Sequence, residues 1–398
     1  MAIKRRTLLQ AGAALTAAVA APSIVRAETK VWRVGASLPM TGPFATAGQL
    51  VAPAFAEFET VVNDNGGIGG IPIKIEVEDS GYIPKNALAN FQRALAGGDL
   101  HYYFGDSTGF MELVGPSLKG DQAVMMGSTS FASVLANPKE RPYQYMAGPT
   151  YEDQFEILLR DVAAKGGKTV AFIYSDTEFG RDPIAHGKKI AAELGLKVVL
   201  DEVTKAAGAD IESHVTKLAQ ANPDYALLQG YVTGVWPQLI GAARAFGLKT
   251  QFMGTFWAME KVVADKVTAQ AGPFLDGYQG VMPYRYFYDQ ENAPYYRELA
   301  AQKKAANPDF PGYVVTWELE GRLNLEIWKK SMEMTLEANK EINADNLMAS
   351  FRSIKDWDSG GFFGAPVTIK DHKIGQGRVY RYSAETKLFT PSSDWFTT

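Results

Sequence analysis

The sequence predicts an α/β protein with two Rossmann-like lobes, each built around a central parallel sheet. Apolar runs of strand length alternate with segments of helix length from residue 31 to residue 126, and this alternation is typical of parallel sheets covered by helices on both faces. A second series of the same kind begins near Pro149 and ends near residue 253. Each series is too short for a TIM barrel, and no low-complexity linker separates them.

The first series carries clear start and stop signals. Pro84 opens a helix that Gly97 and Gly98 close, which is the usual asymmetry of proline at the start and glycine at the end. The glycine-rich stretch 66–70 ends the helix before it. We expect that earlier helix at about 48–63 and strands at 31–38, 73–78, 101–104 and 123–126.

The rest of the chain continues the pattern and then becomes less regular. In the second series we expect helices at 152–165, 182–194, 210–221 and 235–246, with strands at 169–174, 197–203, 225–229 and 251–253. The third section is predicted to contain a strand within 276–284, helices at 292–307, 316–339 and 343–354, and short strands at 367–369 and 377–382. A chain of 398 residues is long enough to bury the cores of two domains.

The first 27 residues are expected to be an export signal that is cleaved near Ala27. Three basic residues at positions 4–6 precede an apolar, acid-free run at 8–21, and Val25 and Ala27 supply the small residues of a peptidase site. The pair Arg5-Arg6 is similar to a twin-arginine signal, while an ordinary secretory signal remains the alternative. The apolar run is shorter than the ~18 residues that a spanning helix needs. We therefore expect a periplasmic protein.

Composition excludes several classes of function. The chain contains 40 basic and 44 acidic residues, and a nucleic-acid-binding surface would instead be basic. It contains no cysteine, so it has neither disulfides nor a lipidated cysteine. Its four histidines show no metal-ligand spacing. The glycine stretch 66–70 follows a helix and precedes a strand, the reverse of a dinucleotide-binding turn. We expect no cofactor, no metal and no nucleic acid.

One motif could indicate an enzyme. Gly105-Asp106-Ser107-Thr108-Gly109 matches the nucleophile elbow of serine hydrolases, and His372 is the one histidine that we consider as its base. A periplasmic serine hydrolase that uses Ser107 is therefore the alternative from another class. We favour a ligand-binding loop, in which two hydroxyl groups and backbone N–H groups receive an anion, and we expect no catalytic residue.

Five aromatic residues each follow a predicted strand. In an open α/β sheet, ligands bind beyond the carboxyl ends of the strands. Aromatic side chains at several equivalent positions of both lobes therefore indicate an apolar ligand pocket. These residues are Phe131, Phe179, Tyr231, Phe256 and Trp257.

Taken together, these features resemble the type I periplasmic binding proteins of ABC importers, and especially the branch that binds branched-chain amino acids. The resemblance covers nearly the whole chain after residue 27. Six stretches carry the resemblance, and they identify the family as a set rather than singly. The stretches are 34–43 (VGASLPMTGP), 63–70 (NDNGGIGG), 78–80 (EDS), 174–180 (YSDTEFG), 246–254 (FGLKTQFMG) and 364–368 (GAPVT).

The resemblance implies two lobes joined by three chain crossings, near 145–149, 277–284 and 356–364, with the ligand held in the cleft between them. It also implies membrane-bound ABC permease subunits as partners, and we expect the protein to be a monomer. The lobe boundaries that follow are 28–147 with 277–356 for the N-terminal lobe, and 148–276 with 357–398 for the C-terminal lobe.

The resemblance also assigns site residues. Ser107 and Thr108 match the loop that binds a ligand carboxylate in the family, and Ser128 and Ser130 lie in the second polar loop of that lobe. Phe179 and Tyr231 match aromatic positions of the second lobe.

Two departures from the family pattern concern the ligand's ammonium group. Thr255, Phe256 and Trp257 occupy the turn in which amino-acid binders carry an acid, and Phe131 replaces a polar residue. A buried ammonium without a partner is costly. We therefore predict an aromatic or other apolar carboxylate that lacks an α-amino group. In the alternative, Glu260 or Asp176 supplies the charge and the ligand is an amino acid or an amide.

Overall fold

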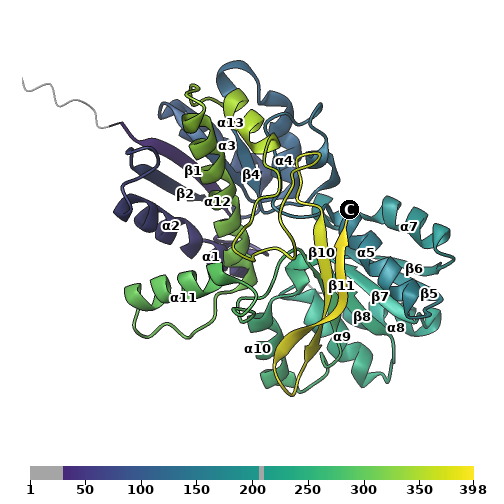
Figure 1. The fold of residues 1–398 in the computed structure, drawn as a ribbon. Helices are drawn as coiled ribbons and strands as arrows, with labels where there is room; N and C mark the ends of the chain where they lie inside the picture. The colour runs from purple at the N-terminus through teal and green to yellow at the C-terminus, as the bar shows by residue number, and fades with distance from the viewer. Residues whose placement is uncertain (1–29, 206–209) are drawn as a thin grey trace, which may run out of the picture. The chain divides into compact units, whose positions relative to one another are not determined.

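The computed structural model describes residues 30–205 and 210–398, and residues 32–398 form one unit. The predicted export signal at 1–27 lies outside the described residues. Within the unit, the strands form two separate sheets, which Figure 1 draws in purple and blue for the first and mainly in teal for the second. Both sheets have a parallel core, so the predicted α/β class with two Rossmann-like halves is confirmed.

The first sheet has the strand order β2-β1-β3-β4, and all its recorded pairings are parallel. Its strands are β1 (Trp32–Leu38), β2 (Ile73–Asp79), β3 (Leu100–Gly105) and β4 (Met126–Ser128). The helices of this part of the chain are α1 (Ala45–Val51), α2 (Pro53–Asp64), α3 (Pro84–Ala96) and α4 (Thr108–Val114), joined from the distant end of the sequence by α12 (Thr316–Glu337) and α13 (Ala344–Arg352).

The second sheet has the order β11-β10-β9-β8-β7-β5-β6. Strands β5 to β9 pair in parallel, whereas β10 is antiparallel to both β9 and β11. The strands are β5 (Thr169–Ser175), β6 (Lys197–Thr204), β7 (Tyr225–Gln229), β8 (Gln251–Gly254), β9 (Gln279–Met282), β10 (Gln376–Ser383) and β11 (Leu388–Thr397). The helices are α5 (Tyr151–Ala164), α6 (Glu178–Arg181), α7 (Ile184–Glu193), α8 (Ile211–Ala221), α9 (Val235–Ala245) and α10 (Lys261–Ala271).

The chain passes between the two sheets three times, as the predicted fold requires. It leaves the first sheet after β4, returns after β9 by way of α11 (Pro294–Ala306) to α12, and leaves again after α13 to form β10. One expected boundary needs correction. Residues 279–282 pair within the second sheet, so the second crossing follows Met282, and the N-terminal lobe cannot resume at residue 277. The remaining lobe boundaries stay a prediction.

Three expected elements differ from the structure for local reasons. The helix predicted at 48–63 is two helices, α1 and α2, because Pro53 begins the second one and has no N–H to continue the first. The expected strand at 367–369 is only an isolated bridge between Trp357 and Val367. Strand β11 was not expected, because Pro391 and two serines interrupt its apolar pattern. An edge strand tolerates a proline that a central strand would not.

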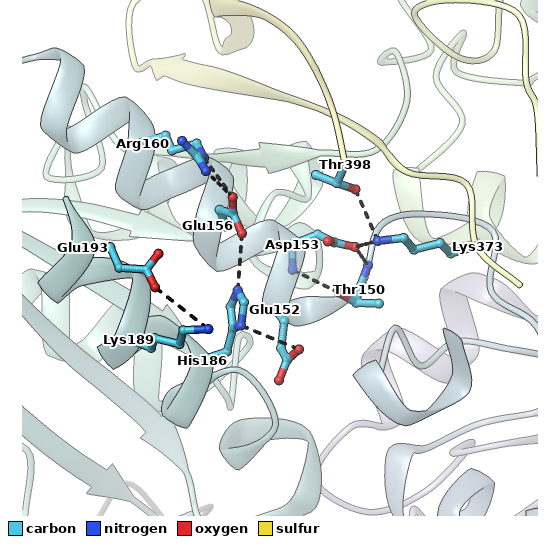
Figure 2. A network of polar contacts seen from close by, with 10 residues as sticks. All are labelled: Thr150, Glu152, Asp153, Glu156, Arg160, His186, Lys189, Glu193, Lys373 and Thr398. Atoms are coloured by element: carbon cyan, nitrogen blue, oxygen red, sulfur yellow. Dashed lines mark hydrogen bonds and ion pairs between the residues drawn. The ribbon is translucent and has the colours of Figure 1, made fainter. Parts of the chain in front are cut away.

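A polar cluster ties the start of α5 to the third crossing (Figure 2). Thr150 and Asp153 form a capping box, in which the Thr150 N–H donates to the Asp153 carboxylate at 2.8 Å and the Asp153 N–H donates to the Thr150 hydroxyl at 3.0 Å. The Lys373 ammonium lies 2.6 Å from the same carboxylate, and only 14% of the lysine and 15% of the aspartate side chain is exposed. The start of α5 and the third crossing are therefore joined by one largely buried ion pair.

Replacing Lys373 with alanine is expected to lower the free energy of unfolding by about 2 kcal/mol, because it leaves a mostly buried carboxylate with one partner fewer. Lys189→Ala is the matched control, because Lys189 lies 3.9 Å from Glu193 and 71% of its side chain is exposed. We expect that control to change stability by less than about 0.5 kcal/mol. Urea unfolding measures both variants, and equal stability of the two would contradict the structural role of Lys373.

Candidate ligand-binding site

A cavity with about 480 Å³ of empty space lies where the carboxyl ends of both sheets meet. It receives residues that follow β1, β2, β3 and β4 of the first sheet and β5, β7 and β8 of the second. Ligands of open α/β sheets bind at this end of the strands. The lining residues are Leu38, Pro39, Phe44, Ala47, Gly48, Val51, Tyr82, Asp106, Ser107, Thr108, Thr129, Ser130, Tyr151, Phe179, Val232 and Trp257.

One wall of the cavity carries paired hydroxyl groups. Thr108 Oγ1 and Ser130 Oγ lie 2.7 Å apart, and Ser130 Oγ also accepts from the Ala132 N–H at 3.1 Å. The two hydroxyls share one hydrogen bond between them, so the proton of the second hydroxyl is available to a ligand. Ser107 caps α4 by accepting from the Phe110 N–H at 3.2 Å. These groups are buried and fixed before a ligand arrives.

The other walls are aromatic. The ring of Phe44 lies 4.1 Å from that of Tyr82 and 6.3 Å from that of Phe179, centroid to centroid. Tyr151 packs edge-on against Phe179 at 5.1 Å, and its hydroxyl accepts from Trp257 Nε1 at 3.1 Å. Rings arranged in this way suit a flat apolar ligand, because edge and face contacts to a further ring are both favourable.

Tyr82 reaches the cavity through an unusual backbone conformation. Its φ is +62°, and it follows Gly81, whose φ is also +62°. A bulky residue in the left-handed region is uncommon and costs energy. The strained turn after β2 places an aromatic ring in the lining of the cavity. Strained backbone conformations of this kind are concentrated at functional sites.

The structure brings five of the nine predicted site residues to the cavity. They are Ser107, Thr108, Ser130, Phe179 and Trp257. The other four, Ser128, Phe131, Tyr231 and Phe256, do not line it. Contact with a ligand stays a prediction for all nine.

The four predicted residues that miss the cavity support residues that line it. Ser128 Oγ accepts from the Ser130 N–H at 2.7 Å, which orients that loop. Phe131 and Phe256 are fully buried and pack against each other at 5.4 Å. Tyr231 stacks on Phe44 at 5.4 Å. Phe131 packs on Tyr151, and Tyr151 forms the wall of the cavity.

Sequence reasoning missed four prominent lining residues, namely Phe44, Tyr82, Asp106 and Tyr151. Asp106 lies inside the Gly105–Gly109 loop, so its carboxyl group is a signal that the sequence itself contains. Tyr151 directly follows the first crossing, where a lining residue is reasonable. The positive φ of Tyr82 could not be read from the sequence, because tyrosine does not indicate that conformation.

The arrangement required of a serine hydrolase is absent. His372 Nδ1 lies 2.9 Å from the Gln144 carbonyl oxygen and 3.2 Å from that of Arg141, and Nε2 lies 3.3 Å from the Arg352 guanidinium. Burial lowers the pKa of His372, and its neighbour Arg352 lowers that pKa further. Ser107 has extended backbone angles, φ −156° and ψ 151°, rather than those of a strained elbow. His372 is thus a structural residue and does not serve Ser107 as a base.

The two acids that we considered as ammonium partners have other roles. Glu260 is buried, and its carboxylate accepts from the Thr316 N–H at 2.7 Å and the Val262 N–H at 2.9 Å, at the starts of α12 and α10. Asp176 is exposed and accepts from the Tyr231 hydroxyl at 2.8 Å. Neither lines the cavity, and among the described residues that do, Asp106 is the one ionisable acid and no lysine, arginine or histidine is present.

Asp182 joins the two halves of the molecule beside the cavity. Its carboxylate accepts from the Ser133 N–H at 3.1 Å and from the Ser133 hydroxyl at 3.0 Å. Ser133 follows β4 of the first sheet, whereas Asp182 lies between α6 and α7 of the second. Burial raises the pKa of Asp182 to about 7, although the Ser133 hydrogen bonds lower it.

The stability of the protein is expected to depend on pH through Asp182. Because its folded pKa lies above its ordinary value, the folded state holds the proton more tightly than the unfolded chain. The resulting stabilisation is present at low pH and is lost as the pH rises through 7. Between about pH 5 and pH 8, the wild type should lose roughly 2–3 kcal/mol relative to Asp182→Asn, which cannot ionise. Urea unfolding at both pH values measures the difference, and identical pH profiles would contradict it.

The fold and the cavity define a two-lobed protein that binds a small solute. The sequence model of the family described as periplasmic binding protein matches residues 31–387. The leucine-specific-binding protein of Salmonella typhimurium is 26% identical over 351 residues, which cover 84% of this chain and 88% of that protein.

Two solved structures are similar in fold. A branched chain amino acid ABC transporter protein from Thermus thermophilus with bound valine has a TM-score of 0.83 at 19% identity, covering 93% of this chain and 97% of its own. The solute binding protein of an ABC transporter from Rhodopseudomonas palustris BisB5, in complex with 3,4-dihydroxybenzoic acid, has a TM-score of 0.76 at 17% identity, covering 92% and 97%.

The chain belongs to the periplasmic binding protein family, as a type I member related to the branched-chain amino acid binders. Its relatives are solute-binding proteins, which agrees with the expectation of a binder rather than an enzyme. In the described part of the chain, no helix is both long and apolar enough to span a membrane, and no group of acidic or histidine residues is arranged to hold a metal ion.

Proposed function

We propose that this chain is the extracytoplasmic solute-binding protein of an ABC importer and that it captures an aromatic or other apolar carboxylate without an α-amino group. The observation that carries the proposal is the cavity itself, in which five aromatic rings surround a buried pair of hydroxyl groups. The rings favour a flat apolar body, and hydroxyl donors suit a carboxylate.

The composition of the lining supports a ligand without an ammonium group. An ammonium in a site of this kind needs an anionic or several neutral acceptors. Glu260 and Asp176 are bonded elsewhere and do not line the cavity. The relative from R. palustris BisB5 was solved with an aromatic acid, so a fold of this type can hold such a ligand.

An amino acid is the second candidate, and one observation favours it. Asp106 lines the cavity and has a carboxylate oxygen without a partner, which could accept from an ammonium group. The Salmonella relative is named for leucine, and the T. thermophilus structure holds valine. The two candidates therefore differ in what Asp106 binds.

A thermal-shift screen of the mature chain separates the candidates, because a ligand that binds only the folded state raises the melting temperature. We expect benzoates, hydroxybenzoates or phenylpropanoates to raise it, and leucine, isoleucine and valine to leave it unchanged. A shift with leucine and none with any aromatic acid would overturn the aromatic-acid proposal. Ester hydrolysis that disappears in Ser107→Ala would instead favour the hydrolase.

Transport and export complete the proposal. The partners are the permease subunits of the importer, the protein acts as a monomer in the periplasm, and residues 1–27 direct it there. Fractionation of cells that express the full chain tests the location. Replacement of both Arg5 and Arg6 by lysine should retain the precursor in the cytoplasm if export uses the twin-arginine route.

A further inference from the structure

One oxygen of the Asp106 carboxylate has no partner although it is buried. Oδ2 accepts from the Ser80 hydroxyl, whereas Oδ1 makes no hydrogen bond within the protein. The residue is 3% exposed and lines the cavity together with Ser107, Thr108 and Ser130. A buried polar atom that is left unpaired costs free energy, so this oxygen is a group that a ligand would satisfy.

Among the described residues, no cation lines the cavity beside Asp106, and Arg93 acts on Tyr103 from outside the lining. The ionisable residues that act on it or face it are Asp79 and Tyr82 in the segment around the end of β2 and Tyr103 on β3. Glu178 of α6 acts on Tyr82 from the second sheet. All are acids or phenols, and the described lining contains no cation.

A carboxylate ligand would therefore enter a cavity in which ionisation of the one lining carboxyl group, that of Asp106, is already unfavourable. Burial raises the pKa of Asp106 to about 6, although hydrogen bonds from the Ser80 and Ser107 hydroxyls and from its own backbone lower it, and the neighbouring Asp79 raises it further. A second negative charge nearby raises the pKa of a carboxyl group again, because two adjacent carboxylates do not both remain ionised in a poorly solvated site.

We propose that Asp106 is the specificity-determining acid of the site and that it binds the ligand in its protonated form, donating a hydrogen bond from Oδ1 to the ligand carboxylate. The inference rests on the proposed carboxylate ligand. The proton comes from solvent, so each binding event takes up one proton and no covalent bond changes. Protonated Asp106 donates to a carboxylate, whereas only ionised Asp106 could neutralise an ammonium group, so the charge that Asp106 carries in the complex distinguishes the two classes of ligand.

Because ligand binding is coupled to protonation of Asp106, the affinity depends on pH in one direction only. Above the pKa of free Asp106, an ionised side chain must first be protonated, so the affinity for the carboxylate falls as the pH rises. The slope approaches about tenfold per pH unit between about pH 6.5 and pH 8. An ammonium ligand held by ionised Asp106 gives the opposite slope, with affinity that rises through pH 6.

Isothermal titration calorimetry with benzoate and 3-phenylpropanoate tests the inference. Titrations in phosphate and in Tris at the same pH count the protons taken up, because the two buffers differ in their heat of ionisation. The expected results are uptake of about one proton per ligand near pH 7.5 and an affinity that falls with pH. Asp106→Asn keeps the shape and an N–H donor but cannot ionise, so its affinity should be independent of pH and its proton uptake should vanish.

Glu193→Gln is the matched control, because Glu193 is exposed and outside the lining. It should retain the proton uptake of the wild type. Binding of benzoate without proton uptake, or with the same pH slope in Asp106→Asn, would overturn the role of Asp106 and leave the proposed function standing. Leucine binding that strengthens through pH 6, with no binding of either aromatic acid, would overturn both.

Discussion

Replacing Trp257 with alanine is expected to lower the affinity for the ligand by about 100-fold. Trp257 lines the cavity, packs against Phe256 at 5.0 Å and donates from Nε1 to the Tyr151 hydroxyl at 3.1 Å. Its removal takes away an aromatic wall of the cavity, and truncating a well-packed aromatic contact typically costs about 2–3 kcal/mol of binding free energy. Calorimetric titration of the variant with the ligand found by thermal shift measures the loss.

Two further variants test whether the loss arises from the cavity. Trp257→Phe keeps one aromatic ring but loses the second ring of the indole and the bond to Tyr151, so its affinity should fall by about tenfold or less. Phe246→Ala removes an aromatic side chain that is 63% exposed and outside the cavity, and it should bind like the wild type. An affinity in Trp257→Ala equal to that in Phe246→Ala would show that the ligand binds elsewhere.

The second large effect is on stability. Gly127→Ala is expected to lower the free energy of unfolding by about 2–4 kcal/mol. Gly127 lies in β4, directly before the polar loop of the site, and a Cβ there would lie 2.1 Å from the Tyr102 hydroxyl and 2.6 Å from Asn324 Oδ1. The Tyr102 and Tyr145 hydroxyls bond to each other at 3.0 Å, and Tyr145 also donates to the Asn324 carbonyl, so the added methyl group must displace a buried polar cluster.

Gly241→Ala is the matched control. Gly241 lies inside α9, and a Cβ there would meet the Phe274 ring at an ordinary contact distance of 3.4 Å. Alanine favours a helix over glycine by up to about 1 kcal/mol, so this variant should be as stable as the wild type or more so. Urea unfolding compares the two. A Gly127→Ala protein with wild-type stability would show that β4 and α12 are less tightly packed than the structure indicates.

The order of strands and helices could be predicted because local signals mark them. Apolar residues repeat with the period of each element, and proline and glycine mark its ends. Pro84 and Gly97 bound α3 closely, and the alternation of strands and helices predicted both parallel sheets. The C-terminal hairpin was harder, because β11 is an edge strand with proline and serine in its sequence and is stabilised by pairing with β10. Pairing between distant segments, such as β9 with β10, leaves no local signal, so the second crossing was placed a few residues early.

The site could be predicted in part, for the same reason. Trp257 was placed at the cavity by its position after a strand, and Ser107 by its loop motif and by the family resemblance. Whether a ring faces the cavity or packs behind it depends on backbone angles and on neighbouring side chains. For this reason Tyr151 lines the cavity, whereas the predicted residue Phe131 packs behind it. Asp106 determines the charge of the site. Its role could not be predicted from the sequence, because it depends on the burial of the side chain and on a carboxylate oxygen without a partner.

The central claim is that the cavity holds one apolar carboxylate. Calorimetric titration of the mature wild-type protein near pH 6, with an aromatic acid and with leucine in parallel, tests it most directly. We expect one aromatic acid to bind per chain, the affinity to fall about 100-fold in Trp257→Ala, and leucine to give no heat. Stoichiometric binding of leucine with no heat from any aromatic acid would contradict it.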